Sequence, residues 1–382
     1  MAVKTNYSKN GSSYYRVTAT IGKDENGKLI RKEFYGKSKK EAEEKRDEYL
    51  INVRSGLAVD YQEHALGNLM KLWLFEVIKP NKAENTLVRY MGIYNYIKSS
   101  NLYSIRIYNL TPMDIQKYYN ELATGGKTHS QILMINKVLK SFFNYCIKQR
   151  YIFFNPCAGV ELPKKDTTSD SEKVDPFTDE EIKTILDGAT DYMIPIITIA
   201  LATGLREGEL LALTIQDIDL SNNTIHVNKS LKATYDIKSE TERTKVIKVG
   251  STKTKSSVRD VPIPKNIAPL LKEQVNNQKM LFMRYGMLQQ TQFLFTTPIG
   301  KCIDPKNLQR RWVRLLNRMN VRYRKFHNIR HTYATKLFEA GINIKTIQTL
   351  LGHSSITITE KTYVHVLQNI KADAVDKINY LF

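Results

Sequence analysis

The first fifty residues alternate between apolar and polar side chains, a pattern that is typical of β-strands. Between residues 15 and 21 every second side chain is apolar or aromatic and the others are polar, which predicts a half-buried strand. The dipeptide Asn26-Gly27 then favours a tight hairpin turn, and a second strand is expected over residues 28–35. Ser38 and Glu41 have the spacing of a capping box, which predicts a helix that runs to about residue 50.

From about residue 64 onward the period changes from two to the 3.6 residues of an α-helix. Apolar side chains recur at helical spacing in residues 86–97 and 130–149, and each pattern predicts a helix with one buried face. Thr111 followed by Pro112 is a helix start signal, because proline lacks an N–H that would have no partner in the first turn. The aromatic residues fall at core positions. Residues 64–163 are therefore predicted to form a compact all-α domain.

The remainder of the chain mixes both periods. Residues 164–176 are polar and charged, which favours a linker, and a third domain is expected over residues 177–382, after a first domain over residues 1–55. Helices are predicted to about residue 215, followed by short strands around residues 224–227, 246–249 and 259–263 and by further helices. The most apolar run, residues 193–205, is too short to span a bilayer and is predicted to be a buried core helix.

The chain carries a large positive charge. Lys and Arg number 58 against 38 Asp and Glu, which gives a formal net charge of +20. Because 42% of the residues are hydrophobic, the chain is globular, and the charge indicates a polyanionic partner, with nucleic acid favoured over a membrane surface. A basic protein without such a partner is the alternative. The candidate DNA-contacting residues are basic positions in the first two domains: Arg16, Lys28, Arg31, Lys32, Lys137 and Lys140.

The cysteines indicate a reducing compartment. Cys146, Cys157 and Cys302 match neither the spacing of a metal site nor that of a disulfide framework. The N-terminus has no apolar stretch behind it, so no secretory signal is expected. The expected location is the cytoplasm.

Candidate chemistry is concentrated in residues 325–366. This segment holds His327, Arg330, His353 and Tyr363, and a cation, two imidazoles and a phenol can together hold and attack a phosphate. Two further groups precede it. Arg206 follows the buried helix, and Glu209, three residues on, could orient it, although a purely structural Arg–Glu pair is an equally good interpretation.

Lys253 lies on a predicted turn between strands, from which a lysine can reach a phosphate. A lone lysine in such a turn is more often simply solvated. No carboxylate cluster accompanies these motifs, so a two-metal nuclease mechanism would have no ligands.

Four motifs together resemble the tyrosine recombinase (phage integrase) family. They are Gly-Leu-Arg-x-Gly-Glu from Gly204, Lys-Thr-Lys-x-Ser-x-Arg-x-Val-Pro from Lys253, His-x-x-Arg-His-Thr-x-Ala-Thr from His327, and Leu-Gly-His-Ser-Ser ahead of Tyr363. The resemblance implies a multidomain fold: a small α+β N-terminal domain with a three-stranded sheet and a helix, an all-α SAM-like core-binding domain, and a mixed, mainly α catalytic domain with a small antiparallel sheet. The N-terminal unit is similar to the arm-binding domains of integrases from phages and conjugative transposons.

The resemblance also implies the role of each residue. Arg206 and Arg330 would clamp the scissile phosphate, since forked guanidiniums neutralise its non-bridging oxygens. Lys253 would protonate the leaving 5′ oxygen, and His327 and His353 would complete the pocket.

The same resemblance makes Tyr363 the nucleophile, which needs a base and a positive field because the pKa of a tyrosine is near ~10. Lys253 fits the family register better than Lys255. Tyr363 is preferred to Tyr380 by its distance from Leu-Gly-His, and His331 is interpreted as a structural residue of the adjoining helix.

The implied activity is site-specific DNA recombination that integrates and excises a mobile element through a 3′-phosphotyrosyl intermediate and a Holliday junction, with no nucleotide or metal cofactor. The implied partners are double-stranded DNA at core and arm sites, a homotetramer on that DNA, an excisionase and a host DNA-bending protein, in a bacterial host. Residues 371–382 form an apolar tail that is expected to pack on a neighbouring protomer. The alternatives are DNA relaxation of the type IB topoisomerase kind and a non-catalytic DNA-binding regulator of the same fold.

Overall fold

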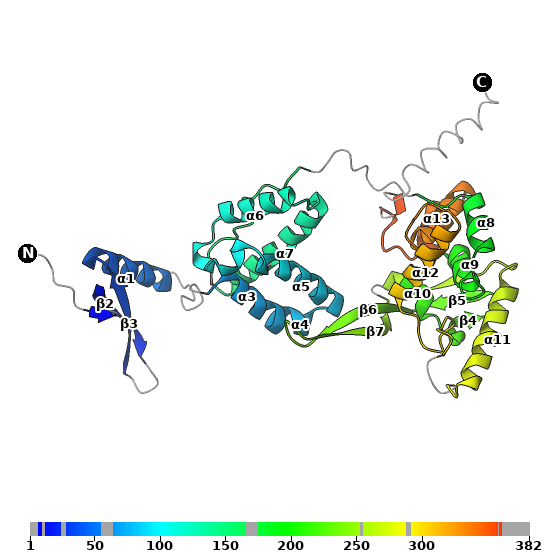
Figure 1. Cartoon of the computed structure of the whole chain (residues 1–382), viewed down its shortest axis with the longest axis horizontal. Coiled ribbons are helices and arrows are strands. Elements are labelled where there is room, and N and C mark those ends of the chain that lie inside the picture. Colours follow the sequence, from blue (N-terminus) through cyan, green and yellow to red (C-terminus); the bar gives the residue numbers. More distant parts are fainter. Residues whose placement is uncertain are drawn as a thin grey trace, which may run out of the picture. The chain divides into compact units, whose positions relative to one another are not determined.

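The computed structural model divides into two compact units, Met1–Thr167 and Thr168–Phe382 (Figure 1). It describes residues 7–9, 12–23, 28–54, 64–164, 175–252, 255–287, 292–357 and 359–360. The chain is multidomain and combines helices with small antiparallel sheets, as predicted. The division into three domains and a linker remains a prediction. Among the described residues, no helix is both long and apolar enough to cross a membrane.

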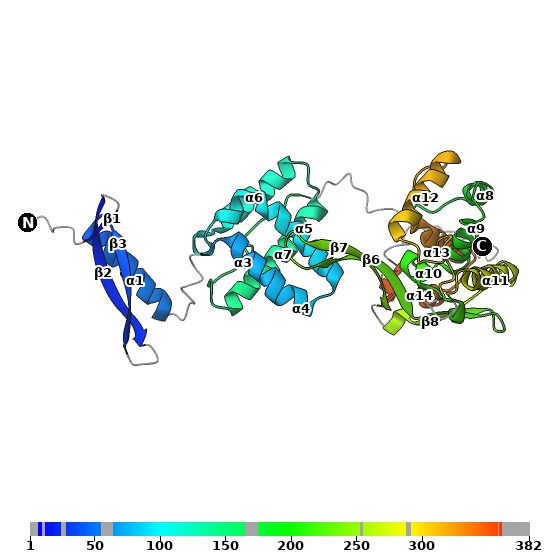
Figure 2. The ribbon, with the colours of Figure 1, turned by 60° about the horizontal axis from the view of Figure 1, so that its bottom comes forward.

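The first unit begins with a three-stranded antiparallel sheet in the order β1-β2-β3. The helix α1 packs on β2 and β3 (Figure 2). At its start the Ser38 hydroxyl accepts a hydrogen bond from the Glu41 amide at 3.1 Å, as the sequence pattern predicted. The Asn26-Gly27 turn lies outside the described residues. The bounds are β1 Tyr7–Lys9, β2 Ser12–Lys23, β3 Leu29–Gly36 and α1 Lys39–Arg54.

The helical part of the first unit packs around aromatic side chains. Trp73 stacks on Tyr90, with 5.7 Å between ring centroids, and contacts Phe142 at 5.5 Å. The predicted start of α6 is present, because Thr111 and Asp114 form a reciprocal capping box ahead of Pro112. The bounds are α3 Leu66–Leu72, the π-helical η1 Trp73–Ile78, α4 Lys79–Asn81, α5 Glu84–Lys98, the 3₁₀ turns η2 Asn101–Ser104 and η3 Ile107–Asn109, α6 Pro112–Thr124 and α7 His129–Lys148.

The second unit surrounds a small sheet with helices. The bounds of its helices are α8 Asp179–Asp187, α9 Ile194–Thr203, α10 Glu207–Ala212, α11 Ala268–Arg284, α12 Pro305–Arg318, α13 Asn328–Glu339 and α14 Ile344–Leu351, with 3₁₀ turns η4 Ile215–Asp217 and η5 Lys255–Ser257. The strands are β4 Ile218–Asp219, β5 Thr224–Val227, β6 Lys229–Ile237, β7 Arg243–Ser251 and β8 Arg259–Pro262.

The strands form two separate antiparallel groups, a β4-β5-β8 sheet and a β6-β7 ribbon. The strand predicted around residues 246–249 is part of the longer β7, and its partner β6 was not predicted. Nine residues of each strand pair in register, from Lys229↔Ser251 to Ile237↔Arg243. A two-stranded ribbon leaves much of both faces in solvent, and the buried positions of β6 do not alternate. The period-2 signal of a half-buried strand is therefore missing.

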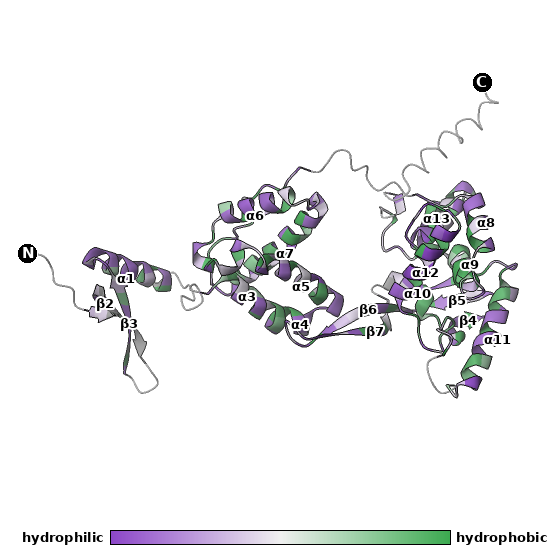
Figure 3. Ribbon diagram, in the orientation of Figure 1, coloured by the Kyte–Doolittle hydropathy of each residue, from purple (hydrophilic) through white to green (hydrophobic). Residues whose placement is uncertain are grey.

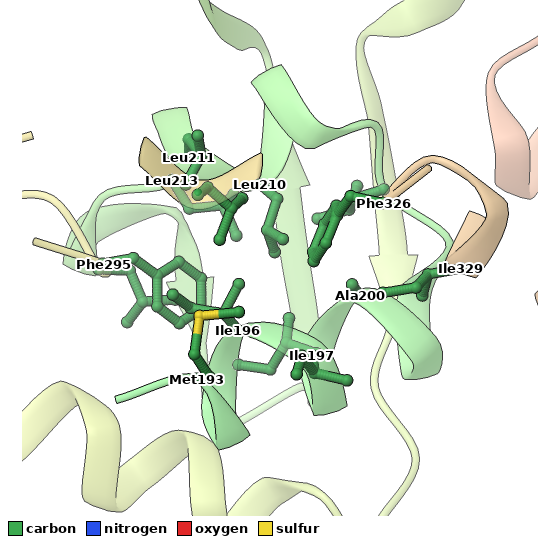
Figure 4. Close-up of a cluster of buried hydrophobic side chains, with 14 of the residues drawn as sticks. Met193, Ile196, Ile197, Ala200, Leu210, Leu211, Leu213, Phe295, Phe326 and Ile329 are labelled. Carbon is green, nitrogen blue, oxygen red and sulfur yellow. The ribbon is translucent and has the colours of Figure 1, made fainter. Parts of the chain in front are cut away.

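The core of the second unit is built on α9, the apolar run at residues 193–205. Its hydrophobic character is visible along the ribbon in Figure 3, and Ile196, Ile197 and Ala200 are at most 1% exposed. Side chains from α10, from the segment before α13 and from Phe295 close around it (Figure 4). The prediction of a buried core helix is confirmed. Because α9 is packed into the core, the loop that follows it starts from a fixed point.

Candidate active site

Arg206 stands between two buried helices. The chain leaves α9 through Gly204, whose φ of 60° is left-handed, and Arg206 is extended, with φ −66° and ψ 147°, immediately before α10. An alanine at position 204 would bring its Cβ within 2.2 Å of the Tyr333 ring. Glycine is thus required here both by the backbone conformation and by the close approach of α13.

Glu209 holds Arg206 at two points. One carboxylate oxygen accepts from the Arg206 backbone amide at 3.0 Å, and the other accepts from Arg206 Nη1 at 2.8 Å. The contact expected from the three-residue spacing is therefore present. It fixes the start of α10 and the direction of the guanidinium with the same side chain.

A second arginine, Arg259, shares this carboxylate. Its Nη2 donates to Glu209 Oε2 at 3.0 Å, and both side chains are nearly inaccessible to solvent. Burial alone would raise the pKa of Glu209, but the charges and hydrogen bonds of Arg259 and Arg206 outweigh it and lower the pKa. Glu209 is thus an ionised, buried carboxylate between two guanidiniums.

The sequence motif contained Arg259, but no role was predicted for it. A signal was present, because Arg259 and Val261 fall on the inward face of β8 while Asp260 and Pro262 point outward. A charged residue on an inward face needs a buried partner. That partner is Glu209.

Three arginines converge on the end of α14. Arg259 Nε donates to the Leu350 carbonyl at 2.7 Å, Arg330 Nη2 donates to the Leu351 carbonyl at 2.6 Å, and Arg206 Nη2 donates to the Gly352 carbonyl at 3.2 Å. These are successive carbonyls at a helix C-terminus, where unpaired carbonyl oxygens carry partial negative charge. The two arginines assigned to the phosphate, Arg206 and Arg330, therefore meet at neighbouring peptide groups.

Arg330 is held from the other side as well. It is 3% exposed, and its Nη1 donates to the Gly204 carbonyl at 2.9 Å. Because Gly204 is only two residues before Arg206, this bond fixes the distance between the two arginines through a short piece of backbone. The structure thus brings together Arg206 and Arg330, which are 124 positions apart in the sequence.

The two predicted histidines flank this arginine pair. His327 is the N-cap of α13, and His353 follows Gly352 and shares a hydrogen bond between its Nδ1 and the Thr359 hydroxyl at 2.8 Å. Burial of the His353 ring and the positive charges of Arg330 and Arg206 lower its pKa to about 3. At neutral pH its imidazole is uncharged.

The pKa of His327 is lowered in the same way. The residue keeps solvent-exposed surface, yet its ring packs edge-on against His331, with 4.9 Å between centroids. Burial of the ring, followed by the charges of His331, Arg330 and Arg206, lowers the pKa of His327 to about 4. His331 lies on α13 as expected, and its ring contact places it directly beside the site.

Two predicted residues, Lys253 and Tyr363, lie outside the described residues. Their roles remain predictions. The neighbouring described positions are Thr252, which directly follows β7, and Glu360.

The candidate DNA contacts of the N-terminal sheet lie on both of its faces. The pair Ala19↔Lys32 is on the side of α1, where Lys32 Nζ lies 4.3 Å from the centre of the Tyr49 ring. Arg16 and Arg31 are on the opposite, open face, where Arg16 also pairs with Glu33 at 3.2 Å. The structure thus separates Lys32 from Arg16 and Arg31. Three other candidates are exposed: Lys28, which directly precedes β3, and Lys137 and Lys140 on α7.

Family models match most of the chain. The model described as "Phage integrase family" matches residues 176–369, and the one described as "Phage integrase, N-terminal SAM-like domain" matches residues 65–123. The chain is also 46% identical over 390 residues to "Tyrosine recombinase XerC-like" from Caldanaerobacter subterraneus subsp. tengcongensis, with 100% of both chains covered.

Two solved structures share the fold. The Tn1549 transposon integrase, in complex with a circular intermediate DNA, matches with a TM-score of 0.65 and 24% identity over 78% of this chain and 94% of that one. A lambda integrase tetramer bound to a Holliday junction matches with a TM-score of 0.57 and 18% identity over 92% and 96% of the two chains. This chain therefore belongs to the phage integrase family of tyrosine recombinases, enzymes that break and rejoin DNA.

Proposed function

We propose that the chain is the integrase of a mobile element, a site-specific recombinase that integrates and excises the element's DNA. The observation that carries the proposal is the convergence of Arg206 and Arg330 on adjacent carbonyls beside His353. Two guanidiniums at one point suit a phosphodiester whose non-bridging oxygens gain negative charge during attack. The imidazoles beside them are neutral at physiological pH, and the negative charge of a bound phosphate would raise their pKa and so favour proton acceptance.

The proposed chemistry is a transfer of the phosphoryl group to tyrosine and back. The Tyr363 oxygen bonds to phosphorus while the bond to the 5′ oxygen breaks, which leaves a 3′-phosphotyrosyl link. The phenolic proton passes to a neutral imidazole, His327, and Lys253 supplies a proton to the departing 5′ oxygen. A 5′ hydroxyl from a partner duplex then reverses the step. Because the ester bond is conserved, the exchange consumes neither a nucleotide nor a metal-activated water.

The assignment to a mobile element is supported by the N-terminal sheet. A sheet with Arg16 and Arg31 on its open face precedes the segment that matches the SAM-like model, and it would bind arm sites while the rest of the enzyme binds the core site. The proposed assembly is a homotetramer on DNA in the bacterial cytoplasm, assisted by an excisionase and a host DNA-bending protein.

A Xer-type recombinase is the second candidate, because the 46%-identical relative carries that name. Selective binding to a separate arm sequence would favour the integrase of a mobile element over the Xer-type recombinase.

The test is covalent trapping on a suicide duplex, which carries the recombination core sequence and a nick near the cleavage position. Wild-type protein is expected to form a covalent 3′ adduct, Tyr380→Phe is expected to retain it, and Tyr363→Phe is expected to lose it. An adduct that persists in Tyr363→Phe would refute the assignment of the nucleophile. Relaxation of supercoiled DNA without strand transfer between duplexes would favour the topoisomerase alternative, and binding without cleavage would favour the regulator.

A further inference from the structure

A hollow lies between α12 and the loop that joins α8 to α9. Its volume is about 140 Å³, and Met193 and Leu315 contribute to an apolar floor. The remaining lining residues are Thr190, Arg311, Arg314 and Arg318. Three arginines at positions i, i+3 and i+7 share one face of a helix, so their guanidiniums gather at the same opening.

Two of these guanidiniums are held in place by neutral groups. Arg311 stacks on the Tyr192 ring, with its Cζ 4.7 Å from the ring centre, and Arg318 Nη2 donates to the Gly188 carbonyl. Neither contact neutralises charge. Arg314, between them, has no hydrogen-bond or ion-pair partner among the described residues, and none of the lining residues is acidic. The hollow therefore gathers three guanidiniums with no carboxylate among its lining residues.

The position of the hollow relative to Arg206 follows from α12 itself. Gln309 donates to Glu207 at 2.7 Å, which ties one side of α12 to α10 next to Arg206. Arg311 is two residues on, a rotation of about 200° around the helix. The hollow and the catalytic arginine therefore lie on opposite sides of α12.

We propose that this hollow binds a second backbone phosphate of the DNA duplex, apart from the phosphate that is cleaved. A guanidinium cluster matches a phosphate in charge and hydrogen-bond geometry. A helix with side chains is about 10–12 Å across, close to the roughly 12 Å width of the DNA major groove. A phosphate site on each side of α12 thus fits the two strands that border one groove. The inference rests on the family's action on DNA and is independent of the role of Tyr363.

The test is the salt dependence of DNA binding by the full-length protein, measured by fluorescence anisotropy on a 30-base-pair duplex. Each phosphate neutralised contributes about 0.9 to the slope of log K against log salt. Arg314→Gln is expected to reduce the magnitude of the slope by about that amount, and Arg314→Lys is expected to retain most of it. Thr190→Asp, which adds a carboxylate to the hollow from another element, is expected to reproduce the loss. Arg284→Gln, an exposed arginine in the last turn of α11, is the matched control and is expected to leave the slope unchanged.

Unchanged slopes in both Arg314→Gln and Thr190→Asp would overturn the proposal. Calorimetry with inorganic phosphate provides a second route to rejection. If wild type binds phosphate and Arg314→Gln does not, while the two proteins have the same slope for DNA, the hollow binds a free anion and the proposal is overturned. Thermal unfolding of each variant checks that the fold is intact. If the suicide duplex gave no adduct with wild type while the slope still fell in Arg314→Gln, the proposed catalytic function would fail and the phosphate site would stand.

Discussion

Arg259 and Arg206 bind the two oxygens of one buried carboxylate, Glu209, with Arg259 Nη2 3.0 Å from Oε2 and Arg206 Nη1 2.8 Å from Oε1. Arg259 is thereby linked to Arg206, the candidate catalytic arginine, although no contact with the phosphate is proposed for Arg259 itself. Removing Arg259 takes one of the two guanidiniums away from the buried Glu209 carboxylate, and breaking a buried ion pair commonly costs about 3–5 kcal/mol.

Arg259→Met is therefore expected to lower the free energy of unfolding by about 3–5 kcal/mol and to reduce formation of the covalent adduct. Urea denaturation measures the first effect and suicide-duplex trapping the second. The matched control is Lys336→Met, which breaks an exposed pair with Asp179 and should cost less than about 1 kcal/mol. Equal losses in the two variants would contradict a special role for the buried pair.

The two histidines predict how stability changes with pH. Their pKa values in the folded protein, about 4 for His327 and about 3 for His353, lie below the unfolded value of about 6.5. Below pH 6.5 the unfolded chain binds protons that the folded protein does not, so stability falls as the pH drops from about 6.5 toward 4. Urea midpoints at pH 7 and pH 5 should show this fall, and His353→Gln should make it smaller. A fall of the same size in that variant would exclude His353 as a source.

Glycine is predicted to be required at position 352 for two reasons: the backbone there is left-handed, and the surrounding atoms leave little room for a side chain. Gly352 has a φ of 65°, and a Cβ there would lie 3.0 Å from Arg259 Nη1 and 3.1 Å from the Ser256 carbonyl. Gly341 has a φ of 76° with no atom within 4 Å of such a Cβ. Alanine at either site pays for left-handed backbone, about 1–2 kcal/mol. Gly352→Ala is expected to lose more stability than Gly341→Ala and, unlike it, to lose adduct formation; equal behaviour would show that the crowding has no effect.

The two faces of the N-terminal sheet predict different effects on binding to arm DNA. Arg31→Gln on the open face is expected to weaken binding to an arm-site duplex severalfold, because a phosphate contact is lost. Lys32→Gln on the face of α1 is expected to leave binding nearly unchanged, because Lys32 lies against Tyr49. Electrophoretic mobility shifts at fixed salt compare the two. A stronger effect of Lys32→Gln would place the DNA on the other face.

The sequence was most informative where a local pattern determines the outcome. The capping box at Ser38, the helix start at Thr111 and the buried run that became α9 each depend on neighbours within a few residues, and all are present. The motifs also singled out Arg206 and Arg330, which the fold brings together.

What the sequence could not supply depends on contacts between distant segments. Arg259 reaches Glu209 across fifty positions, and β6 pairs with β7 without a period-2 burial pattern. The hollow on α12 likewise requires the α8–α9 loop to lie beside its arginines.

The bonds from Arg206 and Arg330 to the Gly352 and Leu351 carbonyls have a consequence for how substitutions of these arginines are interpreted. Each guanidinium also anchors the peptide just ahead of His353. Arg→Lys at either position keeps the charge but replaces a planar fork with a single ammonium. One nitrogen would then have to reach both the phosphate and the carbonyl. The measured loss of rate would then combine weaker phosphate binding with a misplaced imidazole. Only a double-mutant cycle with His353→Gln separates these two contributions.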